Sequence, residues 1–520
     1  MKRILHLLAA SLLATTGQAA DRPNILIAIA DDMSWAHTSA AGCKGVRTPN
    51  IDRLAKSGVM FRNGFCGAPG CSPSRAAFFT GRHVWMNEEA STHHGLFPGK
   101  FVTFPDLLAK AGYATGFTGK PWMPGNLAPD RKGKGNPAGP GFNKHHLKPP
   151  LTGIKDNDYL ANFTEFLGKR QQDAPFYFWF GSMEPHRSYE RGSGLKSGKK
   201  LEDVQVPGFL PDTPETRSDF LDYFAEIEWF DRNLGLMLDQ LEKSGELDNI
   251  LVIVTADNGM AFLRAKATCY EYGLHVPVVV SWPKRIPAGR VVDDPIGFVD
   301  LNATLLAATQ IEHPAKSDPA LAPVGRDFLP LLTSEKQGLV NPDAAFVFAG
   351  HERHTLTRYN DIGYPIRALR TPQHLYLRNL RPDRWPVGDP QRLNHSTGKL
   401  LPLHAGCYRD IDDATTLGWL IQAAKTSEKH AAMLELIVGK HSAEELYDIQ
   451  SDPDCLHNLA TDPKHAEIKT KLATQMDAEL KRTSDPRLYG PNPDIADTYI
   501  NVNEKNKMGE GNYPAPKQQP

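Results

Sequence analysis

Polar side chains with catalytic or metal-binding chemistry follow within a few residues of four short apolar segments of this chain. In chain order they are Asp31 and Asp32 after residues 24–30, Lys120 after 113–118, His186 after 175–180, and Asp257 with Asn258 after 250–255. Carboxylate and amide oxygens are ligands for hard divalent cations. An imidazole transfers a proton near neutral pH. The set predicts a divalent-cation site with a proton donor beside it.

The four apolar segments have the pattern of buried parallel strands. Residues 24–30 (NILIAIA) and 250–255 (ILVIVT) are nearly continuous apolar runs rich in β-branched residues,. Helical patterns lie between the segments; one opens at Thr48-Pro49, with proline at its first turn,. This alternation predicts an α/β sheet. Because ligands bind outside the carboxyl ends of such strands, we expect the four polar groups to converge on one site.

Cys71 opens a further segment with reactive potential, Cys-Ser-Pro-Ser-Arg. The segment precedes a helical pattern, so Cys71 is expected at a helix N-terminus with Arg75 one turn later. Both features favour negative charge at a reacting atom. The spacing alone favours an ordinary packed thiol, and it is not the longer cysteine-to-arginine spacing of cysteine phosphatases.

Residues 71–76, followed by Thr80-Gly81-Arg82, closely resemble the signature of type I sulfatases, in which the cysteine is oxidised to formylglycine. The resemblance extends from residues 24–32 to residues 445–448. It implies an alkaline-phosphatase-like α/β fold: a mixed central sheet flanked by helices, with a smaller C-terminal antiparallel sheet plus helix. A change of pattern near residue 345 agrees with such a second sheet.

The resemblance also implies roles for individual residues. The predicted ligands of a calcium ion, with magnesium as the alternative, are Asp31, Asp32, Asp257, Asn258 and the modified Cys71. The cations around the sulfate would be Arg75, Lys120 and Lys266, and His186 would protonate the leaving group. Conversion of Cys71 implies a partner, either a formylglycine-generating enzyme or an anaerobic maturase.

One position departs from the family pattern. Many members carry Gly-Lys-x-His, whose histidine assists release of the sulfate, whereas this chain has Gly119-Lys120-Pro121-Trp122. The sequence does not show which residue takes over the role of this histidine. The candidates are His37, His93, His94, His145 and His146.

Substrate-binding residues are suggested by similarity to the sulfamidase (heparan N-sulfatase) branch and its bacterial relatives, which act on sulfated sugars. They are Arg264, His351, Glu352 and His354. These residues do not distinguish an N-sulfate from an O-sulfate. Two other functions remain: a phosphodiesterase or phosphonate hydrolase of the same superfamily, and a catalytically silent protein that binds sulfated glycans.

Composition and termini limit the remaining possibilities. The 59 basic and 60 acidic side chains in 520 residues argue against a nucleic-acid partner,. Residues 1–20 have the layout of a secretory signal peptide, which predicts a periplasmic or secreted protein without a membrane span in the mature chain. Six cysteines allow at most one or two disulfides,. The predicted parts are a catalytic domain at 21–365, an α+β subdomain at 366–483 and an irregular tail at 484–520.

Overall fold

The computed structural model describes residues 22–172, 174–394, 397 and 399–503. The predicted signal peptide and residues 504–520 of the predicted tail lie outside the described part. The central element is a seven-stranded sheet of order β10-β2-β9-β8-β1-β7-β5. Its strands are β1 (Asn24–Ala30), β2 (Val59–Phe61), β5 (Ala114–Gly119), β7 (Phe176–Gly181), β8 (Ile250–Ala256), β9 (Val278–Ser281) and β10 (Arg290–Val292).

The sheet is mixed, as expected for an alkaline-phosphatase-like fold. Strands β8, β1, β7 and β5 are neighbouring parallel strands, whereas β9 runs antiparallel to both β8 and β2. Ile27 of β1 pairs with Trp179 on one side and Ile253 on the other. All three side chains are fully buried. The apolar runs in the sequence are therefore the centre of the core.

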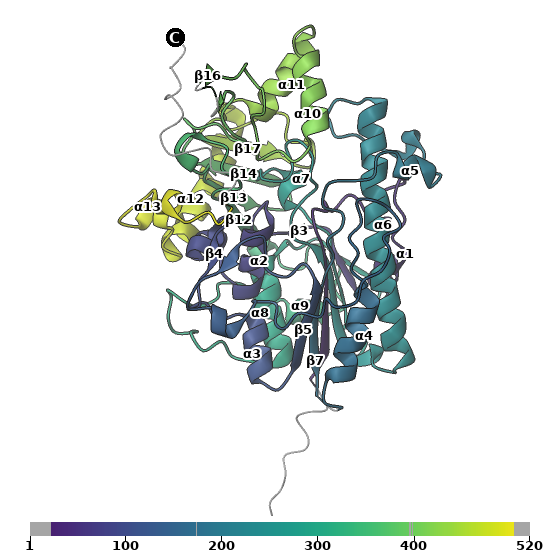
Figure 1. Ribbon diagram of the computed structural model, residues 1–520. Helices are drawn as coiled ribbons and strands as arrows, with labels where there is room; N and C mark the ends of the chain where they lie inside the picture. Colours follow the sequence, from purple (N-terminus) through teal and green to yellow (C-terminus); the bar gives the residue numbers. More distant parts are fainter. Residues whose placement is uncertain (1–21, 173, 395–396, 398, 504–520) are drawn as a thin grey trace, which may run out of the picture.

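Helices cover both faces of this sheet (Figure 1). One group consists of α2 (Cys71–Thr80), α3 (Phe104–Lys110) and α8 (Phe298–Thr309), and the other of α1 (Pro49–Ser57), α4 (Tyr159–Lys169) and α6 (Pro214–Lys243). Pro49 and Pro214 both stand in a first helical turn, where their missing N–H has no intrahelical partner to lose,. None of the described helices is both long and apolar enough to cross a membrane.

A second, antiparallel sheet lies toward the C-terminus. It has the order β12 (Val347–His351), β13 (Ile366–Arg370), β14 (His374–Asn379) and β17 (Glu444–Asp448). Helix α12 (Ala466–Arg482) contacts β14 and buries Leu472, Met476 and Leu480 on one face,. The boundary placed after residue 365 falls between β12 and β13, so this sheet begins before residue 366.

The first part of the predicted tail is packed on the body of the protein. It contains the short helix α13 (Pro486–Tyr489), whose Arg487 is buried. The carbonyl oxygen of Tyr499 accepts a 2.6 Å hydrogen bond from Arg353, and the amide of Val502 donates to His94. Separately, all six cysteines are free thiols, so no disulfide is formed in this structure.

Candidate active site at the carboxyl edge of the sheet

Three of the four neighbouring parallel strands deliver five of the predicted polar residues to one edge of the sheet. Asp31 and Asp32 follow β1, Asp257 and Asn258 follow β8, and Lys120 follows β5, and all five are buried. Backbone hydrogen bonds continue past the strand ends: the amide of Asp257 donates to Ala30, and that of Asp31 donates to Glu184. The neighbouring strand ends therefore place these side chains close together.

Cys71 is the first residue of α2 and is fully buried. Its Sγ lies 3.1 Å from Lys120 Nζ and 3.5 Å from Asp31 Oδ1. Burial raises the pKa of the Cys71 thiol well above its usual range, although the charge of Lys120 opposes this effect,. The thiol is therefore protonated at neutral pH and is a weak nucleophile as it stands.

The acceptor atoms at this edge form a compact group. One ligand atom from each of Asp31, Asp32, Cys71 and Asp257 lies within 4.8 Å of the others. Asn258 adds a buried Oδ1 that has no hydrogen-bond partner among the described residues. The Nδ2 of Asn258 donates a 2.8 Å hydrogen bond to Asp32 Oδ1. This bond turns the Oδ1 of Asn258 away from the Asp32 carboxylate. A set dominated by oxygen fits Ca²⁺ or Mg²⁺ better than a softer metal ion.

Three buried cations surround the acceptor group. Arg75 Nε lies 2.8 Å from Asp257, Lys120 Nζ lies 2.5 Å from Asp31, and Lys266 Nζ lies 2.8 Å from Asp32.

Burial opposes ionisation of Asp31, but the nearby charges, Lys120 foremost, hold its pKa below the usual range,. Arg75 Nη2 is buried without a partner in the described structure. Its free N–H groups suit it to bind an anionic oxygen.

His186 lies at the mouth of this group, with 37% of its side chain exposed. Its Nδ1 is 2.6 Å from the carbonyl oxygen of Arg187, so Nδ1 carries a proton and donates it there,. Its Nε2 is 3.8 Å from Asp32 Oδ2. Nε2 is thus the ring nitrogen that faces the acceptor group and is available for proton transfer.

Sequence reasoning missed Asp412. Its Oδ2 lies 2.8 Å from Lys266 Nζ, which Asp32 also holds at 2.8 Å. One ligand atom from each of Asp32, His186 and Asp412 lies within 4.8 Å of the others. Asp412 stands in the loop between β16 (Lys399–Leu400) and α10 (Ala414–Ala423). No local pattern connects it with the strand ends.

Only some of the five histidines that could replace the missing histidine of Gly-Lys-x-His lie near the acceptor group. His37 contacts the Tyr223 hydroxyl, and the exposed rings of His145 and His146 pair with Glu165 and Asp156.

His93 and its neighbour His94 instead lie near the acceptor group. Burial lowers the pKa of both rings, and the positive charges of Lys120 and Lys266 lower it further. A Cβ built on Gly70, directly before Cys71, would be 3.7 Å from His93 Nδ1 and 3.1 Å from His354 Nδ1. Both Nδ1 atoms are buried without a partner in the described structure. His93 and His354 therefore flank the start of α2.

Of the four predicted substrate-binding residues, His351 and His354 have ring nitrogens without a described partner, whereas Glu352 and Arg264 make structural contacts. The ring of His354 lies tilted against that of His93, with 4.0 Å between ring centroids. His351 is buried, and neither of its ring nitrogens is bonded to a described residue.

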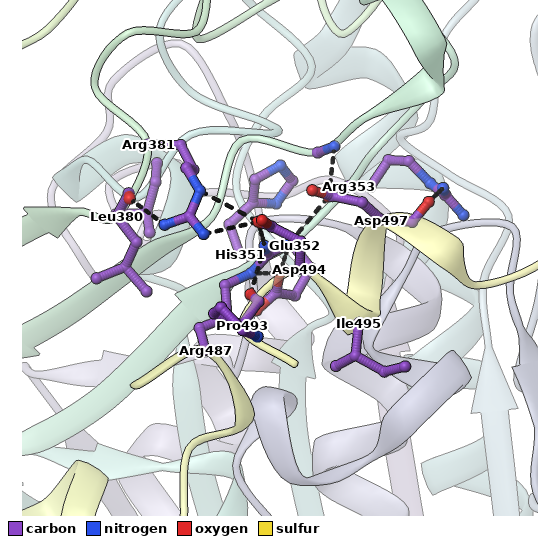
Figure 2. Close-up of polar contacts among 12 residues, drawn as sticks. His351, Glu352, Arg353, Leu380, Arg381, Arg487, Pro493, Asp494, Ile495 and Asp497 are labelled. Carbon is purple, nitrogen blue, oxygen red and sulfur yellow. Dashed lines mark hydrogen bonds and ion pairs between the residues drawn. The ribbon is translucent and has the colours of Figure 1, made fainter. Parts of the chain in front are cut away.

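Glu352, by contrast, is held at 2.7 Å by both Arg367 and Arg487. Figure 2 shows Glu352 and Arg487, which comes from the tail. This enclosure leaves Glu352 2% exposed and engaged in structural ion pairs.

Arg264 also makes structural contacts. It donates to the carbonyl oxygens of Leu436 and Cys455 and lies 3.6 Å over the ring of Tyr270. These contacts join the catalytic part to the C-terminal region. The structure therefore brings neither Arg264 nor Glu352 into polar contact with the residues of the acceptor group.

Comparison with known proteins identifies the family. A family model described as Sulfatase matches residues 23–311. The chain belongs to the sulfatase family. This sulfatase is 28% identical to human N-sulphoglucosamine sulphohydrolase over 512 residues, covering 92% of the chain and 94% of the relative. It is also 28% identical over 479 residues to an ulvan-active sulfatase of Formosa agariphila, covering 91% and 83%. The protein is accordingly an enzyme that hydrolyses sulfate esters or sulfamates.

Solved structures share the fold at lower identity. One is a protein in complex with its substrate D-glucosamine-2-N,6-O-disulfate, with a TM-score of 0.61, 19% identity and coverage of 91% of this chain and 99% of the other. Another is the phosphonate monoester hydrolase of Agrobacterium radiobacter, with a TM-score of 0.60, 17% identity and coverage of 89% and 96%. The fold alone therefore does not separate sulfate from phosphonate chemistry.

Proposed function

We propose that this sulfatase removes sulfate from sulfated carbohydrates, such as glycosaminoglycan or other polysaccharide fragments, with an oxidised Cys71 as its nucleophile. The observation that carries the proposal is the position of Cys71. It starts α2 at the carboxyl edge of the sheet, between an acidic group that suits a cation and basic residues that suit a sulfate.

The substrate class is supported by the relatives. Full-length similarity links the chain to an N-sulphoglucosamine sulphohydrolase and to an ulvan-active sulfatase, both named for action on sulfated sugars. The first name describes a sulfamate and the second does not restrict the bond. The proposal therefore covers sulfate esters and sulfamates.

Conversion of Cys71 to formylglycine agrees with the chemistry of the site. The thiol is buried and its pKa is raised, so an unmodified cysteine is poorly suited to attack an anion,. A hydrated aldehyde at the same position supplies two hydroxyls, one to attack sulfur and one whose deprotonation releases the sulfate. The conversion requires a formylglycine-generating enzyme or an anaerobic maturase.

Asp31, Asp32, Asp257, Asn258 and the converted Cys71 would hold the calcium ion, or magnesium in its place. Bound there, the ion would act as a Lewis acid beside the nucleophile. The buried, unpartnered Asn258 Oδ1 supports this assignment, because a cation would satisfy it,.

The remaining residues of the site have separate tasks in the proposed reaction. Arg75, Lys120 and Lys266 would bind the sulfate oxygens, on which charge increases when sulfur is attacked. His186 would donate a proton from Nε2 to the departing oxygen or nitrogen. His93, whose Nδ1 is free beside Gly70, would accept the proton in the second step.

A phosphonate or phosphodiester substrate is the alternative, because a phosphonate monoester hydrolase has the same fold. Parallel rate measurements on sulfate, phosphate and phosphonate esters of one alcohol separate the two functions. We further propose that the protein is exported to the periplasm or secreted, on the basis of residues 1–20.

The test of the proposed function combines mass spectrometry with a substrate panel. The Cys71 peptide of enzyme made with a maturase should carry an aldehyde in place of the thiol. Sulfate release is then measured from glucosamine N-sulfate, glucosamine 6-sulfate, galactosamine 6-sulfate and 4-nitrophenyl sulfate, with Cys71→Ala as the unconverted control. Converted enzyme that releases sulfate from none of the sugars would refute the carbohydrate assignment.

A further inference from the structure

A short acidic segment, residues 410–413, ties the C-terminal region to the active site. Asp410 Oδ1 accepts hydrogen bonds from the amide and the hydroxyl of Thr355, at 2.8 and 2.7 Å. Thr355 follows His354 directly. Asp413 lies 3.6 Å from Arg187, the residue after His186. The segment is thus anchored at both ends to loops that carry site histidines.

Asp412, between these anchors, points into the site. Its only polar partner among the described residues is Lys266, and the contact uses Oδ2 alone. The Asp412 side chain is 26% exposed, whereas those of Lys266 and Asp32 are 2% exposed or less. The carboxylate therefore forms part of the accessible wall of the site, with Oδ1 free of protein partners in the described structure.

The position of Asp412 relative to His186 is informative. Their ligand atoms, together with one from Asp32, lie within 4.8 Å of one another. In the proposed reaction His186 is the proton donor, so the leaving atom of a substrate would approach its Nε2. A group carried on the next carbon of the leaving sugar would then lie within hydrogen-bond reach of Asp412.

We propose that Asp412 is a specificity residue that accepts a hydrogen bond from a hydroxyl or ammonium group next to the scissile sulfate. This inference rests on the proposed function. A carboxylate can only accept, so Asp412 selects a neighbouring donor and repels a second sulfate group at that position. His354 supports the assignment: its ring is 2% exposed, has an unpartnered Nδ1, and lies close enough to interact electrostatically with Asp412 and Lys266.

The test compares two substrates in one variant. Converted wild type and Asp412→Asn are assayed on the best sulfated amino sugar of the panel and on 4-nitrophenyl sulfate, which has no neighbouring donor. Asn keeps a neutral acceptor oxygen but has no charge, so the charge-assisted hydrogen bond becomes an ordinary one, which lowers kcat/KM by roughly tenfold. We therefore expect the sugar-to-aryl ratio of kcat/KM to fall about tenfold, whatever change in rate the two substrates share through Lys266.

The controls separate the two proposals from each other. Asp477, an exposed residue of α12, is ion-paired with Arg378 of β14, and Asp477→Asn should leave the ratio at the wild-type value. Suppose that the wild type cleaves both substrates and that Asp412→Asn lowers both rates by the same factor. Asp412 then only positions Lys266, and the inference is overturned. An unchanged ratio with unchanged rates overturns it too. Failure of converted wild type on every sugar would refute the proposed carbohydrate function instead.

Discussion

The indole Nε1 of Trp122 donates a 2.9 Å hydrogen bond to the carbonyl oxygen of Ser72, the residue after Cys71. Trp122 is 1% exposed and packs edge-on against Phe97, with 5.1 Å between centroids. The residue that replaces the usual histidine of Gly-Lys-x-His therefore supports the start of α2. Trp122 therefore helps to hold the segment around Cys71 in place.

Trp122→Phe should destabilise the protein and lower its activity. The smaller ring leaves a gap, and the Ser72 carbonyl loses its donor, so we expect the free energy of unfolding to fall by roughly 1–3 kcal/mol. Urea unfolding measures this loss. The matched control is Trp419→Phe at a side chain that is 39% exposed. Equal stability of the two variants would contradict a supporting role for Trp122.

Asp257→Asn should lose both cation binding and stability. Asp257 Oδ2 accepts from Arg75 Nε at 2.8 Å, and Oδ1 accepts from the Asp32 amide at 3.1 Å. Removing one partner of a buried ion pair costs about 3–5 kcal/mol, because the other charge is left uncompensated. Calorimetric calcium titration and thermal unfolding test both effects. Asp293→Asn, whose partner Arg62 is 63% exposed, should change stability little,. Normal calcium affinity in Asp257→Asn would remove it from the ligand set.

Chelation should lower the melting temperature of the converted enzyme. Asp31, Asp32 and Asp257 place negative charge close together, and an ion that binds only the folded state stabilises it,. At a free concentration about a hundredfold above Kd, this stabilisation is about 2.7 kcal/mol. Scanning calorimetry with EDTA, then with added Ca²⁺ or Mg²⁺, measures the effect and compares the ions. An identical melting temperature under all three conditions would argue against a resident divalent ion.

His93→Ala should stop the reaction after sulfate transfer. General-base catalysis contributes roughly 10²–10⁴-fold, so kcat should fall by that range. Intact-mass analysis at steady state should detect enzyme that retains sulfate on residue 71. His145→Ala is the matched control, because that ring is exposed and pairs with Glu165. A slow variant that carries no sulfate would assign His93 to another role.

Glu226 should make stability depend on pH. Burial raises its pKa from 4.5 to about 9, and neither of its carboxyl oxygens has a described partner. Between these values the folded state holds a proton that the unfolded state has released, so stability falls as pH rises. The loss between pH 4.5 and 7 is about 3 kcal/mol.

Urea unfolding across this range tests the prediction. Glu226→Gln has no proton to release, so the corresponding part of the pH slope should be absent in the variant. An unchanged slope would indicate that Glu226 is already ionised in the folded protein.

The sequence by itself determined the sheet and most of the acceptor group. Asp31, Asp32, Lys120, Asp257 and Asn258 follow apolar runs whose composition predicts buried strands. The direction of a strand determines at which edge of the sheet the residue after its last residue lies. Adjacent parallel strands then bring these residues to a common edge. The Cys71 motif is similarly local, because one helix start determines its geometry.

Only the tertiary structure decided the roles of residues whose partners are distant in the chain. Asp412 reaches Lys266 from a loop of the C-terminal region, and Arg487 of the tail encloses Glu352. The orientation of such side chains depends on packing between whole elements, for which a local pattern contains no signal. For the same reason, the sequence left five histidines equivalent, and the fold brought His93 beside Gly70.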